Sequence, residues 1–232
     1  MTLIFEGQTK QVFSTEDEKN ILIKFKDAYC DRAQDEGSFL LVKEMIASKI
    51  NKHFFFLIDS VIQNHIISYN DDYSFLAKKL DIIPLKVIMR NFAAGTICKR
   101  RGYNNGEWFP YPLIEYFLKV KEDELTEVSE AQIVQSGMMN YEAVDKIIEL
   151  SQLVNKILKD YLARYELVLI DIELEFGLDK SGNILLADEI SPYTMRISKQ
   201  NKSIYWDKDD FKKSCDAKLL DTYSELVNIV GA

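Results

Sequence analysis

The sequence has few of the features that mark disulfide-bonded, membrane-spanning or nucleic-acid-binding proteins. Its three cysteines, Cys30, Cys98 and Cys215, are far apart and lack metal-ligand spacing, so we expect reduced thiols in a cytoplasmic protein. No apolar run reaches the roughly 18 residues that a membrane helix needs, and the first residues do not have the layout of a signal peptide. The net charge is −8 and no long basic run is present, which argues against a nucleic-acid partner.

Apolar residues, in contrast, are plentiful. They make up 47% of the 232 residues, which is enough for a full core in one large domain or in two lobes that share a cleft. We predict an α+β protein with a strand-rich N-terminal lobe, residues 1–88, and a mixed C-terminal lobe, residues 89–232.

Hydrophobic patterns predict the order of strands and helices. The clearest helix covers residues 140–165, with apolar residues at helical spacing and Asn140 as its cap. Short runs rich in Val, Ile and Phe, separated by turn residues, predict strands. The predicted strands are 2–7, 11–15, 20–26, 53–59, 64–70, 83–92, 166–177 and 184–190, and the other predicted helices are 38–50 and 219–230.

Three carboxylates alternate with apolar residues in the stretch LIDIELEFG. Because side chains of a strand alternate between its faces, Asp171, Glu173 and Glu175 share one face. The sequence DKSGN predicts a tight turn, after which ILLADE runs back antiparallel and brings Asp188 close to Glu173 or Glu175. Clustered carboxylates suit Mg²⁺ that is also held by substrate phosphates, although an exposed acidic strand face is an equally simple interpretation.

Two other stretches carry groups that suit phosphate. In FEGQTKQVF, Gly7 lies at a turn and Lys10 enters the following strand, as in glycine-turn phosphate sites, although many ordinary hairpins look the same. In RNFAAGTICKRRG, Arg90 ends an apolar strand and Thr96 opens a helix after small residues, an arrangement that suits a phosphate or a solvated basic turn. Lys99 adds positive charge there.

These stretches together resemble the SAICAR synthetase family, the phosphoribosylaminoimidazole-succinocarboxamide synthases. The matching pieces are EGQTKQVF, IPLKVIMRNFAAGTICKRRG, LVLIDIELEFGLDKSGNILLADEISPYTMR and YWDKDDF, in family order over most of the chain. The resemblance implies a two-lobed fold, kinase-like or ATP-grasp-like, with antiparallel sheets and a nucleotide cleft between the lobes.

The resemblance also implies the ligands and the residues that hold them. ATP and Mg²⁺ are the expected cofactors, with a phosphoribosylated carboxylate and an amine as substrates, and a homodimer is expected among the partners. The implied ATP-binding residues are Gly7, Gln8, Lys10, Glu175 and Asp188; the metal ligands are Glu175 and Asp188; and the catalytic residues are Lys10, Asp171 and Arg196. The implied substrate-binding residues are Arg90, Thr96, Lys99, Glu173, Ser191, Tyr193, Arg196 and Asp207.

Several positions depart from the family pattern. Gln8 replaces the first Lys of Gly-Lys-x-Lys, Glu173 replaces the Lys of Asp-x-Lys-x-Glu-Phe-Gly, and Tyr193 replaces the Asp of Ser-Pro-Asp. A Ser-Ala-x-x-Gly loop expected after Phe25 is missing, and Val120 and Lys121 stand where the family has Asn-Asp and Asp-Pro elements. These changes concentrate where the reacting carboxylate and the amine are expected, whereas the Mg-ATP residues are kept.

The resemblance therefore predicts an ATP-dependent ligase that forms an amide through an acyl phosphate. Three alternatives stay open at this point. The chain is a family ligase with altered substrates from a specialised pathway, the ordinary purine-pathway enzyme that joins carboxyaminoimidazole ribotide to aspartate, or a non-catalytic nucleotide-binding relative. Asp171 is a candidate base for the amine.

Overall fold

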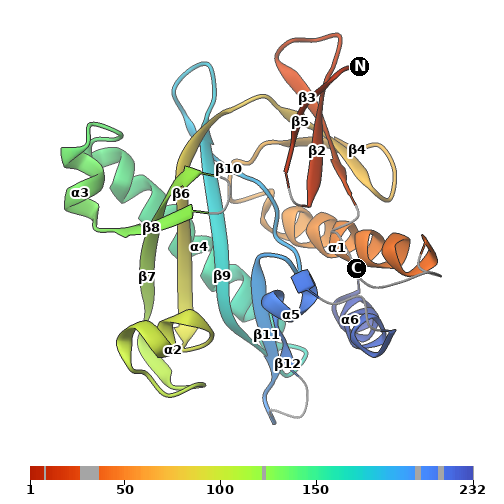
Figure 1. Cartoon of the computed structure of the whole chain (residues 1–232), viewed down its shortest axis with the longest axis vertical. Coiled ribbons are helices and arrows are strands. Elements are labelled where there is room, and N and C mark those ends of the chain that lie inside the picture. The colour runs from red at the N-terminus through yellow and green to blue at the C-terminus, as the bar shows by residue number, and fades with distance from the viewer. Residues whose placement is uncertain (8, 27–36, 122–123, 202–204, 214–216, 232) are drawn as a thin grey trace.

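Two antiparallel sheets organise the molecule (Figure 1). The computed structural model describes residues 1–7, 9–26, 37–121, 124–201, 205–213 and 217–231. The first sheet has the order β1-β2-β3-β5-β4 and comprises β1 (Leu3–Glu6), β2 (Lys10–Ser14), β3 (Asn20–Phe25), β4 (Ile66–Tyr69) and β5 (Ser74–Lys78). The α+β class with antiparallel sheets is confirmed.

The second sheet is larger and is built on two long central strands. Its order is β12-β11-β9-β6-β7-β8, and β10 pairs with β9 beside β11. Its strands are β6 (Asp81–Phe92), β7 (Trp108–Lys121), β8 (Glu124–Val128), β9 (Leu167–Leu178), β10 (Ile184–Ala187), β11 (Met195–Lys199) and β12 (Tyr205–Trp206).

Six helices accompany the sheets in the described residues. They are α1 (Gly37–Ile58), α2 (Thr96–Arg101), α3 (Glu130–Gln135), α4 (Tyr141–Ala163), α5 (Lys208–Lys213) and α6 (Ala217–Val230). No helix in this part of the chain is long and apolar enough to cross a membrane.

Helix α4 covers one face of the second sheet, and strand alternation decides which face that is. Ile172, Leu174 and Phe176 of β9 are buried in the core that also contains Val154 and Leu158 of α4. Burying a side chain of this size contributes about 1.5–3 kcal/mol. The alternate residues of β9 are left on the opposite face, away from α4.

The turn between β9 and β10 forms as predicted. The Asp179 carboxylate accepts hydrogen bonds from the backbone amides of Ser181 (2.8 Å) and Asn183 (2.9 Å), and Gly182 takes the left-handed conformation with φ 81°. β10 then returns antiparallel with Ala187 opposite Glu175, so that Asp188 lies one residue beyond register with Glu175.

The prediction of a strand over residues 53–59 is wrong. This segment continues helix α1 to Ile58. Phe54, Phe55 and Ile58 are all buried, and they continue the buried pattern of Ile46 and Ile50. A short run of aromatic residues does not distinguish a strand from a helix that is buried on most of its sides, and here tertiary packing decides for the helix.

The change from one sheet to the other lies between Lys78 and Asp81. The predicted boundary between residues 88 and 89 falls inside β6, a central strand of the second sheet. The two lobes, 1–88 and 89–232, therefore stay a prediction that matches the sheets only approximately.

Loss of the α4 cap is expected to destabilise the protein. Asn140 Oδ1 accepts a hydrogen bond from the backbone amide of Ala143 at 2.9 Å, and Asn140→Ala removes it. We expect a loss of about 1 kcal/mol in unfolding free energy, measured by urea denaturation. Asn140→Ser keeps an acceptor and is the control; equal losses in both variants would contradict a capping role.

Candidate functional site

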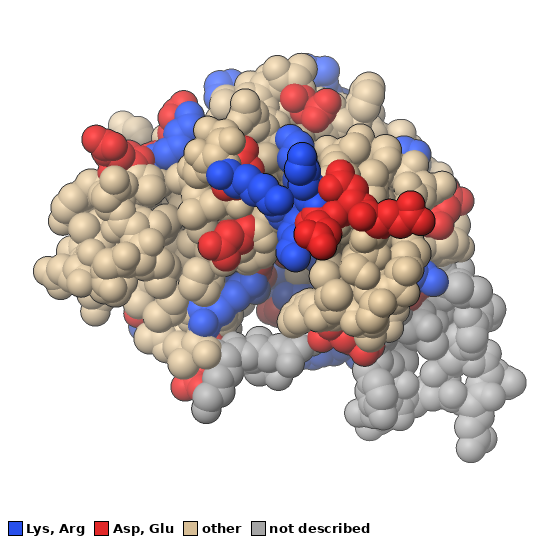
Figure 2. All heavy atoms as spheres, turned by 90° about the horizontal axis from the view of Figure 1, so that it is seen from above, with Lys and Arg blue, Asp and Glu red and all other residues tan. Residues whose placement is uncertain are grey.

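The face of the second sheet opposite α4 carries charged side chains from four neighbouring strands. We call it the charged face: Lys86 and Arg90 of β6, Glu115 and Lys119 of β7, Asp171, Glu173 and Glu175 of β9, and Arg196 of β11. Strand register puts Lys86 opposite Glu175, and Arg90 opposite Asp171. The three carboxylates of β9 thus share one face as predicted, and cations of neighbouring strands stand beside them. Seen from above, basic side chains gather near the centre of the molecule with acidic ones beside them (Figure 2).

Asp171 is the centre of a buried network of ion pairs. Its Oδ2 accepts hydrogen bonds from Arg90 Nη1 at 2.8 Å and Arg196 Nη1 at 2.7 Å, and its Oδ1 accepts one from Lys208 Nζ at 3.1 Å. Asp171 is fully buried, and Arg90 also donates from Nε to Glu115 at 2.5 Å. The network satisfies charges that would be very costly to bury alone.

Arg196 lies at the more open edge of this network. Its Nε donates to Asp207 at 2.8 Å, and its Nη2 contacts Asp209, whose side chain is 43% exposed. These carboxylates and Asp171 raise the pKa of Arg196 although burial alone would lower it. Gly95 presses its backbone against the same guanidinium, since a Cβ there would lie 2.7 Å from Arg196 Nη2. Its φ of 68° also favours glycine.

The residues predicted to bind phosphate therefore differ in their exposure to solvent. Arg90 is 2% exposed and held by two carboxylates, whereas Thr96 and Lys99 lie exposed on α2, which Thr96 opens as predicted. Arg196 lies between the buried ion pairs and the exposed helix α2, because its guanidinium contacts Asp171 on one side and approaches Gly95 on the other.

Glu173 is surrounded by lysines. Lys208 Nζ lies 2.7 Å from Glu173 Oε1, Lys86 Nζ lies 2.9 Å from Oε2, and Lys212 Nζ lies 3.9 Å from Oε2. Burial would raise the pKa of Glu173, but the charges of Lys208, Lys86 and Lys212 lower it well below its usual range. Glu173 is therefore an ionised, compensated carboxylate.

Lys10 joins the first sheet to the loop that follows β10. Its ammonium contacts Asp188 and lies 2.6 Å from Glu189 Oε1, and Thr9 Oγ1 donates to the same oxygen at 3.2 Å. Burial would lower the pKa of Lys10, but Asp188 and Glu189 raise it. Gly7 donates from its amide to the Lys10 carbonyl at 2.9 Å and closes the turn before β2. Gln8 lies outside the described residues.

Glu175 and Asp188 form a carboxylate pair beside Lys10. Burial and the charge of Asp188 raise the pKa of Glu175, although Lys119 contacts the same carboxylate and opposes this shift. Burial would also raise the pKa of Asp188, but Lys10, Lys119 and Lys86 lower it. A carboxylate whose ionisation is disfavoured by burial and by a neighbouring carboxylate suits a cation placed between the two groups.

Within the described residues, no group of three or more His, Cys, Asp or Glu side chains forms a metal cluster. A divalent cation at Glu175 and Asp188 therefore needs further oxygen ligands from water or from a bound phosphate. This is how Mg²⁺ is commonly held in nucleotide sites. The pair of residues predicted as metal ligands fits such an ion.

The loop after Asp188 is anchored by buried side chains. Ser191 and Tyr193, both predicted to bind substrate, are buried at 0% and 2% exposure. Ser191 Oγ donates to Glu189 and accepts the Tyr193 amide at 3.1 Å, and the Tyr193 ring packs on Phe211 at 4.8 Å between centroids. Their contacts fix the loop that carries Asp188 and Glu189.

His65 supports the backbone of Asp188. Asp188 has a positive φ of 60°, which is uncommon for a residue with a side chain. His65 is buried, and its Nε2 lies 3.1 Å from the Asp188 carbonyl oxygen. Burial lowers the pKa of His65 to about 4, so the ring is neutral at pH 7 and its Nε2 carries the proton that it donates.

A cavity of about 670 Å³ opens between the sheets next to the point where the chain passes from one to the other. The side chains of Lys10 and Ser14 lie on the same face of β2, because every second residue of a strand shares a face. Ser14 lines the cavity, so the cavity and the Lys10 ammonium lie on the same side of the first sheet. Its lining mixes polar and charged residues, such as Thr15, Lys79 and Asp179, with apolar ones from both sheets and the connection between them: Ile4, Ile21, Leu80 and Leu178.

Sequence reasoning missed several charged partners, among them Lys86, Glu115, Lys119 and Lys208. Lys86 could have been predicted from the sequence, because it lies four residues before Arg90 and therefore on the same face of a strand. Glu115 and Lys119 depend on which strand pairs with β6, and Lys208 depends on where α5 packs. Pairings of this kind are not visible in local sequence.

The comparisons with known proteins agree with one another. A family model described as SAICAR synthetase matches residues 3–228. A phosphoribosylaminoimidazole-succinocarboxamide synthase of a Thermoanaerobacter species is 35% identical over 233 residues, which cover 99% of this chain and 97% of that protein.

Solved structures give the same result. A SAICAR synthetase in complex with ADP has a TM-score of 0.86 at 31% identity, covering 97% of this chain and 96% of that one. The phosphoribosylaminoimidazole-succinocarboxamide synthase of Ehrlichia chaffeensis has a TM-score of 0.85 at 31% identity, covering 99% and 98%.

The His65 contact yields a test of how Asp188 is held. His65→Phe keeps a ring against Phe55 and Phe75 but removes the donor to the Asp188 carbonyl. Loss of a hydrogen bond of about 1 kcal/mol should weaken Mg²⁺-dependent ADP binding about fivefold, as measured by calorimetry. His65→Gln, which can still donate, should lose less. Wild-type affinity in His65→Phe would contradict this role.

Proposed function

This chain belongs to the SAICAR synthetase family and is an ATP-dependent amide-forming ligase, and we propose that it catalyses the reaction named for its relatives. In that reaction the carboxylate of carboxyaminoimidazole ribotide is joined to the amine of aspartate. The observation that carries this proposal is the junction of Lys10, Asp188 and Glu175 between the two sheets.

The nucleotide is assigned to this junction. The apolar lining of the cavity, from Ile4, Ile21, Leu80 and Leu178, suits a purine base. Phosphates extending from it along β2 reach the ammonium of Lys10. Glu175 and Asp188 are the residues that would hold Mg²⁺, which neutralises phosphate charge when it is bound.

The phosphorylated substrate is assigned to the far end of the charged face. Arg196 is the best-placed guanidinium, because Asp207 and Asp209, which occupy two of its donors, are partly exposed. Thr96 and Lys99 on α2 are exposed. They follow closely in sequence after Gly95, whose backbone approaches Arg196. Arg90 is assigned a supporting role, since its guanidinium is buried against Glu115 and Asp171.

Asp171 is better suited to positioning than to proton transfer. It is fully buried and accepts hydrogen bonds from Arg90, Arg196 and Lys208, so an amine has no direct approach to it in this arrangement. We propose that Asp171 orients Arg196 and Lys208 toward the substrate. This replaces the role of base that the sequence suggested.

Phosphorylation is needed because a carboxylate does not condense with an ammonium in neutral water. Transfer of the γ-phosphoryl group to the substrate carboxylate turns one oxygen into a leaving group, and attack by the free amine then releases phosphate. The protein contributes orientation and fixed positive charge from Lys10 and Arg196.

A second candidate keeps the chemistry but changes the carboxylate or the amine. Tyr193 favours it, because a bulky ring packed on Phe211 stands where the family has a compact acid. Glu173 favours it less, since its charge is already compensated by Lys86 and Lys208.

The deciding experiment measures ADP release from Mg-ATP with carboxyaminoimidazole ribotide, with and without aspartate, and identifies the product by mass spectrometry. Aspartate-dependent release with the succinocarboxamide mass establishes the proposed reaction. If Mg-ATP binds but nothing is released, a panel of amines and carboxylates separates altered substrates from lost catalysis.

Removing either proposed metal ligand should stop turnover. Glu175→Gln and Asp188→Asn keep side-chain size but remove charge that would hold Mg²⁺, and we expect kcat to fall at least about a hundredfold. Glu166→Gln, at an exposed position before β9, is the matched control. Wild-type rates in the first two variants, with unchanged thermal unfolding, would refute the metal assignment.

The ion pair of Glu173 with Lys86 can be tested by exchanging the charges of the two residues. Glu173→Lys places an ammonium among Lys86, Lys208 and Lys212 and should lower stability and activity strongly. Lys86→Glu combined with Glu173→Lys restores the cross-strand pair and should recover most of the loss. Additive effects of the two substitutions, measured as unfolding free energies, would show that the pair is not coupled.

A further inference from the structure

Two lysines meet the carboxylate of Glu173 in the middle of the charged face. Asp171, Glu173 and Glu175 lie two residues apart on one face of β9, so the outer two are separated by about 13 Å. Asp171 belongs to the ion pairs around Arg196, and Glu175 belongs to the proposed metal site. A substrate whose phosphate lies at Arg196 and whose carboxylate takes a phosphoryl group from the nucleotide therefore has to pass over Glu173.

The two lysines differ in the contacts that hold them. Lys208 Nζ lies 2.7 Å from Glu173 Oε1 and 3.1 Å from Asp171 Oδ1, and its side chain is 3% exposed. Lys86 Nζ lies 2.9 Å from Glu173 Oε2, which is its only ion-pair partner among the described residues, and its side chain is 19% exposed. An ammonium has three donors, so Lys86 can bind an anion in the site without leaving Glu173.

Lys86 also faces the proposed metal site. It lies opposite Glu175 in the register of β6 and β9. Burial would lower the pKa of Lys86, but the charges of Glu173, Glu175 and Asp188 raise it, so the side chain is an ammonium. Lys86 therefore places an accessible positive charge between the nucleotide end and the phosphate end of the charged face.

The departure from the family pattern at position 173 also points to Lys86. The pattern Asp-x-Lys-x-Glu-Phe-Gly has a lysine at this point of β9, whereas this chain has Glu173. Because the side chains of Lys86 and Glu173 meet across the two strands, the chain still carries an ammonium there. That ammonium comes from β6 instead of β9.

We propose that Lys86 is a catalytic residue that binds the reacting carboxylate and the phosphoryl group during transfer, in place of the lysine that the family has at position 173. This inference rests on the proposed function. An oxygen of the substrate carboxylate bonds to the γ-phosphorus, and the bond from that phosphorus to the bridging oxygen of ADP breaks. ADP leaves with the electron pair, and no proton moves. The ammonium offsets the negative charge of the two anions that approach each other, and Glu173 holds it in place.

Two double variants separate a catalytic ammonium from a structural ion pair. Lys86→Gln with Glu173→Gln keeps the net charge but removes the ammonium, whereas Lys86→Glu with Glu173→Lys moves the ammonium to β9. With Mg-ATP, carboxyaminoimidazole ribotide and aspartate, we expect the single-turnover rate of ADP formation to fall about a hundredfold in the neutral pair and less than about tenfold in the swapped pair.

Binding gives a readout that a structural role would not change. Measured by calorimetry, Lys86→Gln should weaken binding of carboxyaminoimidazole ribotide about tenfold and leave binding of the same ribotide without its carboxylate unchanged. Lys86→Arg keeps a positive charge and should recover most of this affinity.

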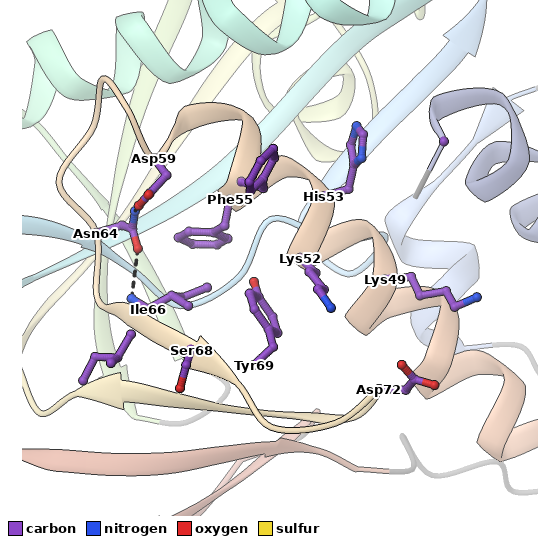
Figure 3. A pocket seen from close by; sticks show the side chains of 13 residues that line it. Lys49, Lys52, His53, Phe55, Asp59, Asn64, Ile66, Ser68, Tyr69 and Asp72 are labelled. Carbon is purple, nitrogen blue, oxygen red and sulfur yellow. Dashed lines mark hydrogen bonds between the residues drawn. The ribbon is translucent and has the colours of Figure 1, made fainter.

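Lys52→Gln is the matched control and should keep wild-type rates and affinities. Lys52 is an exposed lysine of α1 that lies over the ring of Tyr69 in a separate groove of about 520 Å³ (Figure 3). Wild-type rates in the neutral pair, equal losses in the two double variants, or equal weakening of both ribotides would overturn the inference while the proposed function stands. A wild-type protein that forms no ADP with the ribotide would overturn the proposed function, and this inference with it.

Discussion

The ion pairs around Asp171 are the constraint on which the rest of the site depends. A fully buried carboxylate is stable in its charged form only if cations and hydrogen bonds replace water, and here Arg90, Arg196 and Lys208 do so from two strands and a helix. The requirement fixes the registers of β6 and β11 against β9 and the position of α5 over the sheet. The same contacts leave Arg196 with its remaining donors directed toward Asp207 and Asp209 at the open edge.

Local sequence was sufficient wherever one segment determines its own structure. The β9 alternation, the Asp179 turn and the return of β10 place Glu175 next to Asp188, and all of this follows from period two and turn chemistry. The aromatic run 53–59 was misread because its period is ambiguous and packing on several sides decides it. Lys119 and Lys208 were missed because their places depend on which strand and which helix become neighbours of β9.

The substitutions that separate this chain from its family are easier to weigh in three dimensions than in sequence. Glu173 inverts a charge, yet Lys86 lies across the strand pair at 2.9 Å and Lys208 at 2.7 Å, so the local field changes less than the sequence suggests. A relative with Lys at this position would repel Lys86, and we therefore expect an acid at position 86 wherever position 173 is basic. At position 193 a neutral ring replaces an acid, and this ring packs into the core on Phe211.

The contact of Lys10 with Asp188 and Glu189 connects the first sheet to the loop after β10. Under the proposed function, a triphosphate would bring negative charge to this point, and the ammonium of Lys10 would turn toward the phosphates. Asp188 would then lose its ammonium partner while remaining beside Glu175, whose pKa is raised by burial and by Asp188 itself. Mg²⁺ held by Glu175 and Asp188 would balance that negative charge. The proposed function therefore requires Lys10 and the metal to neutralise the same carboxylates in turn.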